Sequence, residues 1–180
     1  MQHNARDPLR DHVHGRIYRI TYPSRPLVKA APVAGAPVEA LLENLKAPEM
    51  RQRYRTRREL RAHPASEVLP AVKAWAVEQT DVHAKLEALW VTWGMNQVDD
   101  FLLREVLGSP DFHARAAAVR VLRYNTHRIS DHVALLEKAA QDENGRVRLE
   151  AIVAASWLPN IPAAKNIVAL AAKLPLDEWS

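Results

Sequence analysis

The hydrophobic positions of residues 38–173 recur three and four residues apart, which is the spacing of amphipathic helices. In one segment Leu86, Leu89, Trp90 and Trp93 share a single apolar stripe. Proline, glycine, aspartate and asparagine separate the periodic segments, as expected of turns. The pattern predicts a first helix beginning near residue 38, followed by helices over 50–63, 67–79, 82–94, 97–107, 112–124, 131–141, 146–157 and 163–173.

One pattern of residues occurs twice in the second half of the chain. Arg115 and Ala118 recur as Arg148 and Ala151 at one and the same interval (148 − 115 and 151 − 118). Repetition at such an interval is typical of stacked helical pairs, in which each pair buries its apolar face against the next. The sequence therefore predicts an all-α superhelix over 38–180, built of about four helical hairpins (38–62, 66–94, 97–124 and 130–157) and a final helix.

The ends of the helices also carry sequence signals. Ser66, Asp81 and the pair Ser130–Asp131 precede apolar segments and are predicted to be N-caps, because their side chains can accept backbone N–H groups. Gly94 is predicted to end the helix that contains Trp90.

Residues 1–37 have a different pattern and are predicted to form an extended arm. Residues 16–22 alternate polar with β-branched or aromatic side chains, which predicts one half-buried strand. A lone strand needs a partner, so this strand would pair with a copy of itself in a homodimer, lie on the helices, or have lost its native sheet. Pro26, Pro32 and Pro37 make residues 26–37 a stiff linker.

Composition restricts the chemistry. The chain has 180 residues, a formal net charge of +4 and no cysteine, which excludes disulfides, thiolate metal sites, a cysteine nucleophile and covalent haem attachment within these residues. His12 and His14 would share one face of a strand and could grip a metal, but no third ligand stands nearby. No catalytic constellation and no cofactor motif stand out, so we expect no enzyme activity from this chain alone. No run of 18 apolar residues is present to span a membrane.

Six arginines gather on one predicted helix and form the candidate interaction surface. Two interpretations remain open: a surface that follows phosphates on nucleic acid, or a solvated or interface face on which arginine stems cover apolar neighbours and Glu59 pairs with Arg55. We favour the second. The arginines fall in two stripes at helical spacing: Arg51, Arg55 and Arg58 in one, Arg53, Arg57 and Arg61 in the other.

The repeated pattern, a turn with proline or aspartate followed by Arg115 and Ala118 or by Arg148 and Ala151, resembles HEAT repeats. A second resemblance covers about residues 7–157. The segment 14–22 is similar to the closing strand of a β-propeller of the soluble sugar dehydrogenase type. The segments 25–28, 53–55, 57–60, 86–90, 115–124 and 146–151 resemble the middle region of large planctomycete and verrucomicrobial "membrane-bound dehydrogenase domain" proteins.

That second resemblance implies a setting for the chain. Proteins of that family carry an N-terminal propeller, a HEAT-repeat middle and a C-terminal c-type cytochrome module, which implies export to the periplasm. Only one propeller strand and no Cys-x-x-Cys-His motif occur here, so the active site and haem of such a protein would lie outside these residues. The chain is then expected to be a non-catalytic scaffold whose partners are the propeller and cytochrome c modules.

An alternative role is that of a basic HEAT-like protein that binds nucleic acid. The alkylpurine DNA glycosylases are HEAT-like and use aromatic residues and an aspartate on a basic concave face. Trp90, Trp93, Asp99 and Asp100 could suggest such a pocket. The simpler interpretation is that the two tryptophans pack in the core and the two aspartates cap the next helix.

Overall fold

The computed structural model describes residues 13–15, 17–20, 22, 24, 29–175, 177 and 179. The chain divides into two compact units, residues 1–30 and 31–180. In the first unit, the described residues form no helix or strand. The second unit, called the helical unit below, contains all of the regular secondary structure of the described residues.

The helical unit confirms the all-α fold class. Its described residues form nine α-helices, one short 3-10 helix (η2, Thr126–Arg128) and no strand. The α-helices are α1 (Val38–Asn44), α2 (Met50–Leu60), α3 (Ala65–Val77), α4 (Val82–Gly94), α5 (Asp100–Leu107), α6 (Phe112–Tyr124), α7 (His132–Ala139), α8 (Gly145–Ala155) and α9 (Ile161–Ala171).

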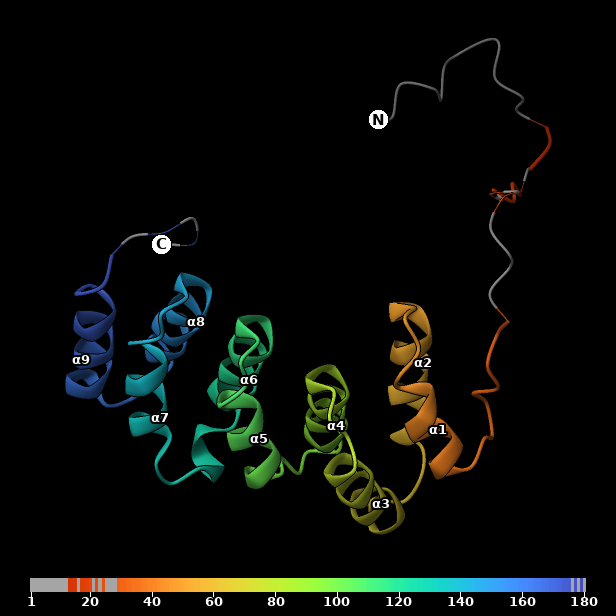
Figure 1. Ribbon diagram of the computed structural model, residues 1–180, viewed down its shortest axis with the longest axis horizontal. Helices are drawn as coiled ribbons and strands as arrows, with labels where there is room; N and C mark the ends of the chain where they lie inside the picture. The colour runs from red at the N-terminus through yellow and green to blue at the C-terminus, as the bar shows by residue number, and fades with distance from the viewer. Residues whose placement is uncertain are drawn as a thin grey trace. The chain divides into compact units, whose positions relative to one another are not determined.

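Successive helices pair into hairpins, as the repeat pattern predicts. Helices α1 and α2 pack together, as do α3 and α4, α5 and α6, and α7 and α8, while α9 packs against α7 and α8. Within the helical unit the hairpins stand in a row in chain order (Figure 1). The second helices of the hairpins, α2, α4, α6 and α8, contact one another along one side of the row and are called the inner layer. Helices α1, α3, α5 and α7 form the outer layer.

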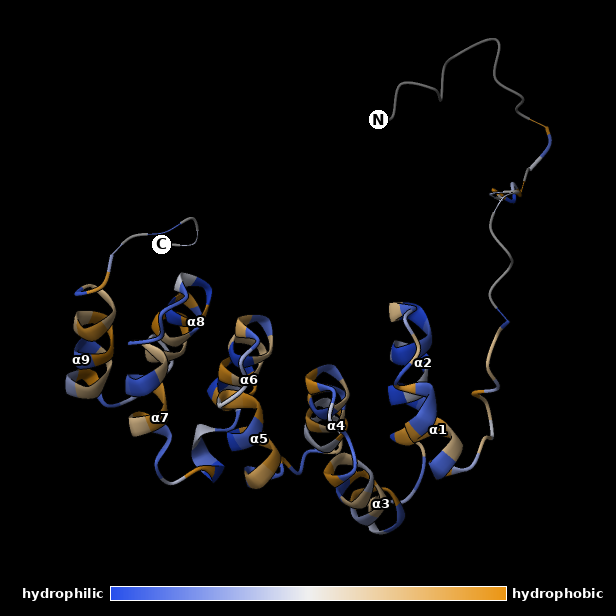
Figure 2. Cartoon of the chain, viewed as in Figure 1, coloured by the Kyte–Doolittle hydropathy of each residue, from blue (hydrophilic) through white to orange (hydrophobic). Residues whose placement is uncertain are grey.

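One continuous core joins the hairpins. It is built mainly of leucine, valine and alanine and extends from Leu41 in α1 to Ile167 in α9. Hydrophobic and hydrophilic residues alternate along every helix (Figure 2), because each helix packs on its neighbours with one side and meets water with another. The repeated alanines Ala118 and Ala151 are fully buried, and their small side chains let α6 and α8 approach closely.

Residues 31–37, the part of the linker that belongs to the helical unit, pack on the first hairpin. Gly35 adopts the left-handed conformation (φ 67°), which favours glycine, and its N–H donates to Glu59 Oε1 at 2.7 Å. Asn44 Nδ2 donates to the carbonyl of Pro32 at 2.7 Å. Glu59 is therefore committed to the linker and does not pair with Arg55 as the sequence suggested.

The structure does not support the predicted strand over residues 16–22. Residues 17–20 and 22 have no strand conformation, and Ile17, Ile20 and Tyr22 are exposed. A β-strand needs a neighbouring strand to pair its backbone groups, and none is found among the described residues. Arg16 and Thr21 lie outside the described residues, as does His12 of the suggested histidine pair. Pairing of two copies through this segment stays a prediction.

Two of the predicted helix ends need correction, and two are confirmed. Helix α3 begins at Ala65 behind Pro64, so Ser66 lies inside the helix and does not cap it. Helix α4 does end at Gly94, and the left-handed residue that follows is Asn96 (φ 60°). Asp131 occupies the N-cap position of α7, but its carboxylate binds Arg104 at 2.7 and 2.9 Å instead of the helix. Asp81 does cap α4, accepting from His83 N at 3.0 Å.

Candidate functional site: the inner layer

The inner and outer layers differ in charge. The four inner helices contain eleven Lys or Arg and three Glu, a net charge of +8 (11 − 3). The four outer helices contain three Lys or Arg and six Asp or Glu, a net charge of −3 (3 − 6). The net charge of +4 on the whole chain is therefore unevenly distributed, and the inner layer is basic. A basic layer is a candidate binding surface for an acidic partner.

Three of the inner arginines have the same structural role. Each lies in the first turn of an inner helix and its Nη1 donates to the carbonyls five and six residues earlier, in the turn that joins the two helices of the hairpin. These bonds satisfy carbonyls that the outer helix and the turn leave without helical partners. The pairs are Arg53 with Ala47 O (2.6 Å) and Pro48 O (2.8 Å), Arg115 with Ser109 O (3.0 Å) and Pro110 O (3.1 Å), and Arg148 with Asp142 O (3.0 Å) and Glu143 O (2.9 Å).

The same arginines also reach the following repeat. Arg115 binds both carboxylate oxygens of Asp142, at 2.7 Å and 2.8 Å, and these hydrogen bonds raise the pKa of the Arg115 guanidinium. Arg53 Nε donates to Glu87 Oε1 at 3.0 Å, and Arg148 Nη2 lies 3.4 Å from Asp177 Oδ2. Arg53 and Arg115 therefore fasten their own turns to the next hairpin, and Arg148 fastens its turn to the segment that follows α9, which is a structural role.

Glu87 is a fully buried carboxylate at the contact of α2 and α4. Arg53 and Arg57 of α2 both bind it, and His83 Nε2 lies 3.5 Å away. A buried charge is tolerated when it is paired and hydrogen-bonded, and here two cations meet one anion. Two of the six arginines of the predicted surface, Arg53 and Arg57, are therefore held inside the α2–α4 contact.

The other four arginines of the predicted cluster are exposed. They contact no carboxylate in the part of the chain that the structure describes, and they do not form one surface. Arg61 lies against Gly94, Arg58 lies 6.0 Å from the centre of the Tyr54 ring, and Arg55 and Arg58 both face the linker residues Ala31–Ala34. The four are Arg51, Arg55, Arg58 and Arg61.

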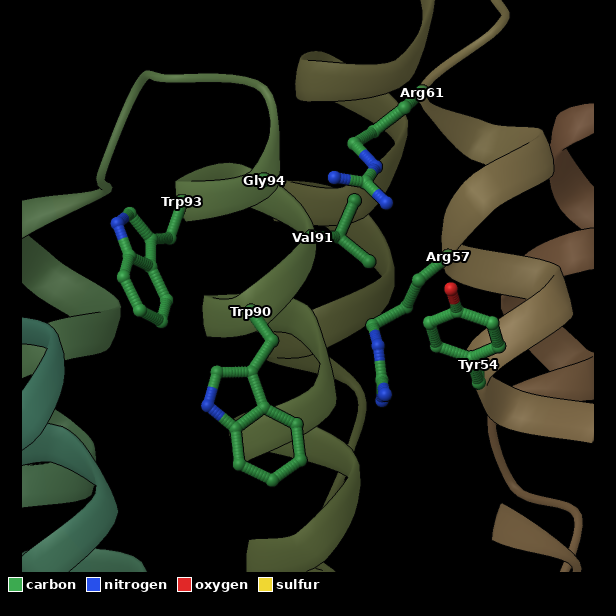
Figure 3. A pocket seen from close by; sticks show the side chains of 7 residues that line it. All are labelled: Tyr54, Arg57, Arg61, Trp90, Val91, Trp93 and Gly94. Carbon is green, nitrogen blue, oxygen red and sulfur yellow. The ribbon is translucent and has the colours of Figure 1, made fainter. Parts of the chain in front are cut away.

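A groove of about 540 Å³ opens between α2 and α4 and is called the inner groove. Tyr54, Arg57 and Arg61 reach into it from the α2 side. Trp90 and Val91 of α4 lie nearest to them, and the Trp93 ring lies on the side of α4 away from α2 (Figure 3). Arg57 lies over the Trp90 ring at 5.2 Å, in cation–π geometry. The lining residues are Tyr54, Arg57, Arg61, Trp90, Val91, Trp93 and Gly94.

The two tryptophans of this groove correct the sequence interpretation, which assigned them to the core. Trp90 and Trp93 are half-buried: one side of each packs on the core and the other lines the inner groove. The helical stripe that they share with Leu86 and Leu89 is wider than the buried part of α4. The apolar periodicity therefore located the stripe but not its edge, where the two tryptophans line the inner groove.

Aromatic side chains continue along the inner layer beyond the groove. Trp93 stacks on Tyr124 with ring centres 5.5 Å apart, and Tyr124 meets Trp157 edge-on at 5.2 Å. The Arg123 guanidinium lies 4.7 Å from the Tyr124 ring and 5.4 Å from the Trp157 ring. We call Trp93, Tyr124 and Trp157 the aromatic row; Trp157 is 59% exposed. This row joins three hairpins on one surface.

The acidic residues suggested for a base-excision pocket lie elsewhere. Asp99 caps α5, accepting from Leu102 N at 2.9 Å, and its other oxygen lies 3.5 Å from Lys73 Nζ. Asp100 pairs with Arg104 at 2.9 Å. Neither lines the inner groove. Within the described residues no three His, Asp or Glu side chains gather as metal ligands, and no helix is long and apolar enough to cross a membrane.

Comparison with known families finds one match. Residues 100–178, which are 79 of the 180 residues and contain α5 to α9, match a family model described as HEAT repeats. Comparisons with curated proteins and with solved structures found no match. The family match supports a HEAT-repeat identity, and with the all-helical fold it indicates a helical scaffold or interaction module.

Proposed function

We propose that the chain is the non-catalytic scaffold of a larger exported, dehydrogenase-like redox protein, in which it holds a propeller and a c-type cytochrome module and docks partners on its inner layer. The observation that carries the docking role is the inner layer itself, where the inner groove and the aromatic row are exposed on a basic surface. The setting rests on the sequence resemblance described above, together with the HEAT-repeat match. Location in the periplasm is part of the same proposal.

The parent protein can be sought directly in cell fractions. An antibody against this chain should recover, from the periplasmic fraction, a protein much larger than 20.3 kDa that stains for covalent haem. The gene should encode, in the same reading frame, a propeller upstream and a Cys-x-x-Cys-His motif downstream. A haem-free protein confined to another fraction would refute the redox setting.

The charge of the inner layer favours one second candidate, a basic HEAT-like protein that binds nucleic acid in the manner of the alkylpurine DNA glycosylases. Its support is the net charge of +8 (11 − 3) on the four inner helices. Titration with duplex DNA at two salt concentrations tests it, because each phosphate contact lowers the log–log slope of affinity against salt by about 0.9. Binding that shows no salt dependence would exclude this candidate.

A further inference from the structure

Most of the positive charge of the inner layer is already neutralised within the chain. Seven of the eleven basic residues of the inner helices contact a carboxylate: Arg53, Arg57, Lys85, Arg115, Arg120, Arg146 and Arg148. Those without such a contact among the described residues are Arg51, Arg55, Arg58 and Arg123, and Arg61 at the end of α2 joins them. The uncompensated charge is therefore small and local. Arg61 lines the inner groove, whereas Arg58 lies near the Tyr54 ring and faces the linker.

The inner groove has the walls of a side-chain pocket. Tyr54, Trp90, Trp93 and Val91 provide aromatic and aliphatic surface, and its volume of about 540 Å³ lies in the range of ligand pockets, about 300–1,000 Å³. Arg61 stands at its edge, and its guanidinium contacts no carboxylate among the described residues. A pocket with apolar walls and a cation at its rim suits an apolar or aromatic group that has a negative charge beside it.

The aromatic rings of this surface are poorly placed to stack on nucleic-acid bases. Base stacking needs an open ring face. One face of Trp93 is covered by Tyr124, and Arg57 lies over Trp90. Arg123 lies over both Tyr124 and Trp157. The few uncompensated arginines would also make fewer than the roughly six to ten phosphate contacts of a salt-sensitive DNA-binding protein. These features favour a peptide over nucleic acid.

The C-terminal segment of this chain shows how an acidic, aromatic peptide docks on an inner helix. The Asp177 carboxylate accepts from Gly145 N at 2.6 Å at the start of α8. Arg146 lies over the Trp179 ring at 5.5 Å. A Cβ at Gly145 would overlap the Asp177 carboxylate where it now lies, so the carboxylate sits close to the helix backbone. An aspartate and a tryptophan two residues apart therefore engage a backbone amide and an arginine of the inner layer.

We propose that the inner groove binds an extended acidic segment of a partner protein, which packs an aromatic side chain against the exposed Tyr54 ring and places its carboxylates beside Arg61. The inference rests on the proposed docking role of the inner layer and adds the site and the chemistry of the occupant. It is independent of the redox setting: a groove that binds such a peptide is informative whether or not a haem-bearing parent exists.

The probe is a fluorescein-labelled acidic hexapeptide with one central tryptophan, titrated with the full chain and followed by fluorescence anisotropy. We expect saturable binding that weakens about tenfold when the peptide tryptophan is replaced by alanine, since buried aromatic anchors dominate such interfaces. Arg61→Glu should weaken binding about tenfold or more, because it places a like charge beside the peptide carboxylates.

Arg51→Glu is the matched control, since Arg51 lies on the same helix, is exposed and does not line the groove. We expect a change of less than about twofold for this variant, corresponding to a rim charge outside the site. Tyr54→Ala and Phe101→Ala form a second pair: both side chains are exposed aromatics, but only Tyr54 lines the inner groove, so only Tyr54→Ala should weaken binding. Circular dichroism verifies that each variant is folded.

Three results would overturn the proposal. The first is absence of saturable binding by the tryptophan peptide. The second is an equal effect of Arg61→Glu and Arg51→Glu, which would indicate general attraction of anions. The third is tighter binding of a single-stranded oligonucleotide than of the peptide, with both charge reversals weakening it alike, which would assign the surface to nucleic acid. None of these bears on whether the chain belongs to a haem-linked parent, which the antibody experiment decides separately.

Discussion

The outer and inner layers use charged residues differently. In the outer layer the charged pairs are exposed, both where they are close in sequence, as Arg104 with Asp100, and where they join hairpins, as Arg104 with Asp131. In the inner layer they connect successive hairpins and are largely buried, as Arg53 and Glu87 show. Exposed pairs contribute little to stability, whereas removing one member of a buried pair is costly. The comparison teaches that the arginines of a stacked array can serve mainly to hold neighbouring hairpins together. Only the arginines without a carboxylate partner then identify a binding surface.

The largest expected effect tests the buried ion pairs of the inner layer. Glu87→Gln keeps the shape of the side chain but removes its charge, which leaves Arg53 and Arg57 facing each other without an anion. We expect a loss of about 3 kcal/mol in the free energy of unfolding, measured by urea denaturation, because an uncompensated buried charge is strongly destabilising. The α2–α4 contact should also lose protection in hydrogen exchange.

The control for this prediction is Glu105→Gln. Glu105 pairs with Lys85 between an outer and an inner helix, but its side chain is one third exposed. The expected loss is below about 1 kcal/mol. Equal losses of unfolding free energy for the two variants would show that burial does not determine how much these ion pairs contribute to stability.

The next prediction concerns the arginine that fastens its turn to the following hairpin. Arg115→Lys keeps the charge but cannot reproduce the planar fork that binds Asp142 twice and two carbonyls at once. We expect a loss of about 2 kcal/mol in unfolding free energy, since hydrogen bonds of charged groups each contribute about 1.5–3 kcal/mol. Arg120→Lys, whose side chain is nearly half exposed, serves as the control and should lose less than half as much.

Most of the fold could be predicted from the sequence, because the repeated residues recur at a constant interval that equals the length of one structural repeat. The constant offset between the two copies of the pattern and the apolar spacing located four hairpins and a final helix, each close to the observed ends. The ends themselves were less accessible. Ser66 has the chemistry of an N-cap, but Pro64 already fixes the backbone at that point. Gly94 is the last residue of α4, as predicted, but the left-handed conformation after the helix is adopted by Asn96, which tolerates it.

The candidate site was harder to predict, although one signal was present. Arg53 precedes Arg115 by the same offset that relates Thr56 to Ala118 and Leu60 to Leu122 (115 − 53, 118 − 56 and 122 − 60). The repeat alignment alone therefore marks Arg53 as a structural arginine. Glu87 gives no such signal, because its burial depends on how α2 meets α4. The inner groove could not be predicted either, because hydrophobic periodicity does not reveal that the α4 tryptophans lie at the edge of the buried stripe.

A smaller effect is expected at the caps of the inner helices. Asp111 accepts from His113 N at 2.9 Å at the start of α6. Asp111→Ala removes this acceptor and should lower the unfolding free energy by about 1 kcal/mol, measured from the urea midpoint. Asp111→Asn retains a cap oxygen and should lose much less. If Asn destabilised as much as Ala, the negative charge beside the helix N-terminus would matter more than the hydrogen bond.

The smallest effect, a gain, would sharpen the comparison between repeats within the inner layer. Lys85 takes in α4 the place that Arg115 has in α6, but its single ammonium group pairs only with Glu105 among the described carboxylates. Lys85→Arg supplies the planar fork with which the three turn-binding arginines reach the carbonyls five and six residues earlier, which here belong to Gln79 and Thr80. We expect the variant to keep the Glu105 pair and gain about 0.5–1 kcal/mol in unfolding free energy, seen as a higher urea midpoint with an unchanged slope.

Lys73→Arg on the outer helix α3 is the matched control for this gain, because its exposed side chain has no such turn to bind and the stability of the variant should not change. A neutral result for Lys85→Arg would mean that the turn between α3 and α4 holds its carbonyls differently from the turns of the other three hairpins. The shared role of the inner arginines would then be limited to those three hairpins, and the second hairpin would depend on the buried Glu87 for its attachment to the first.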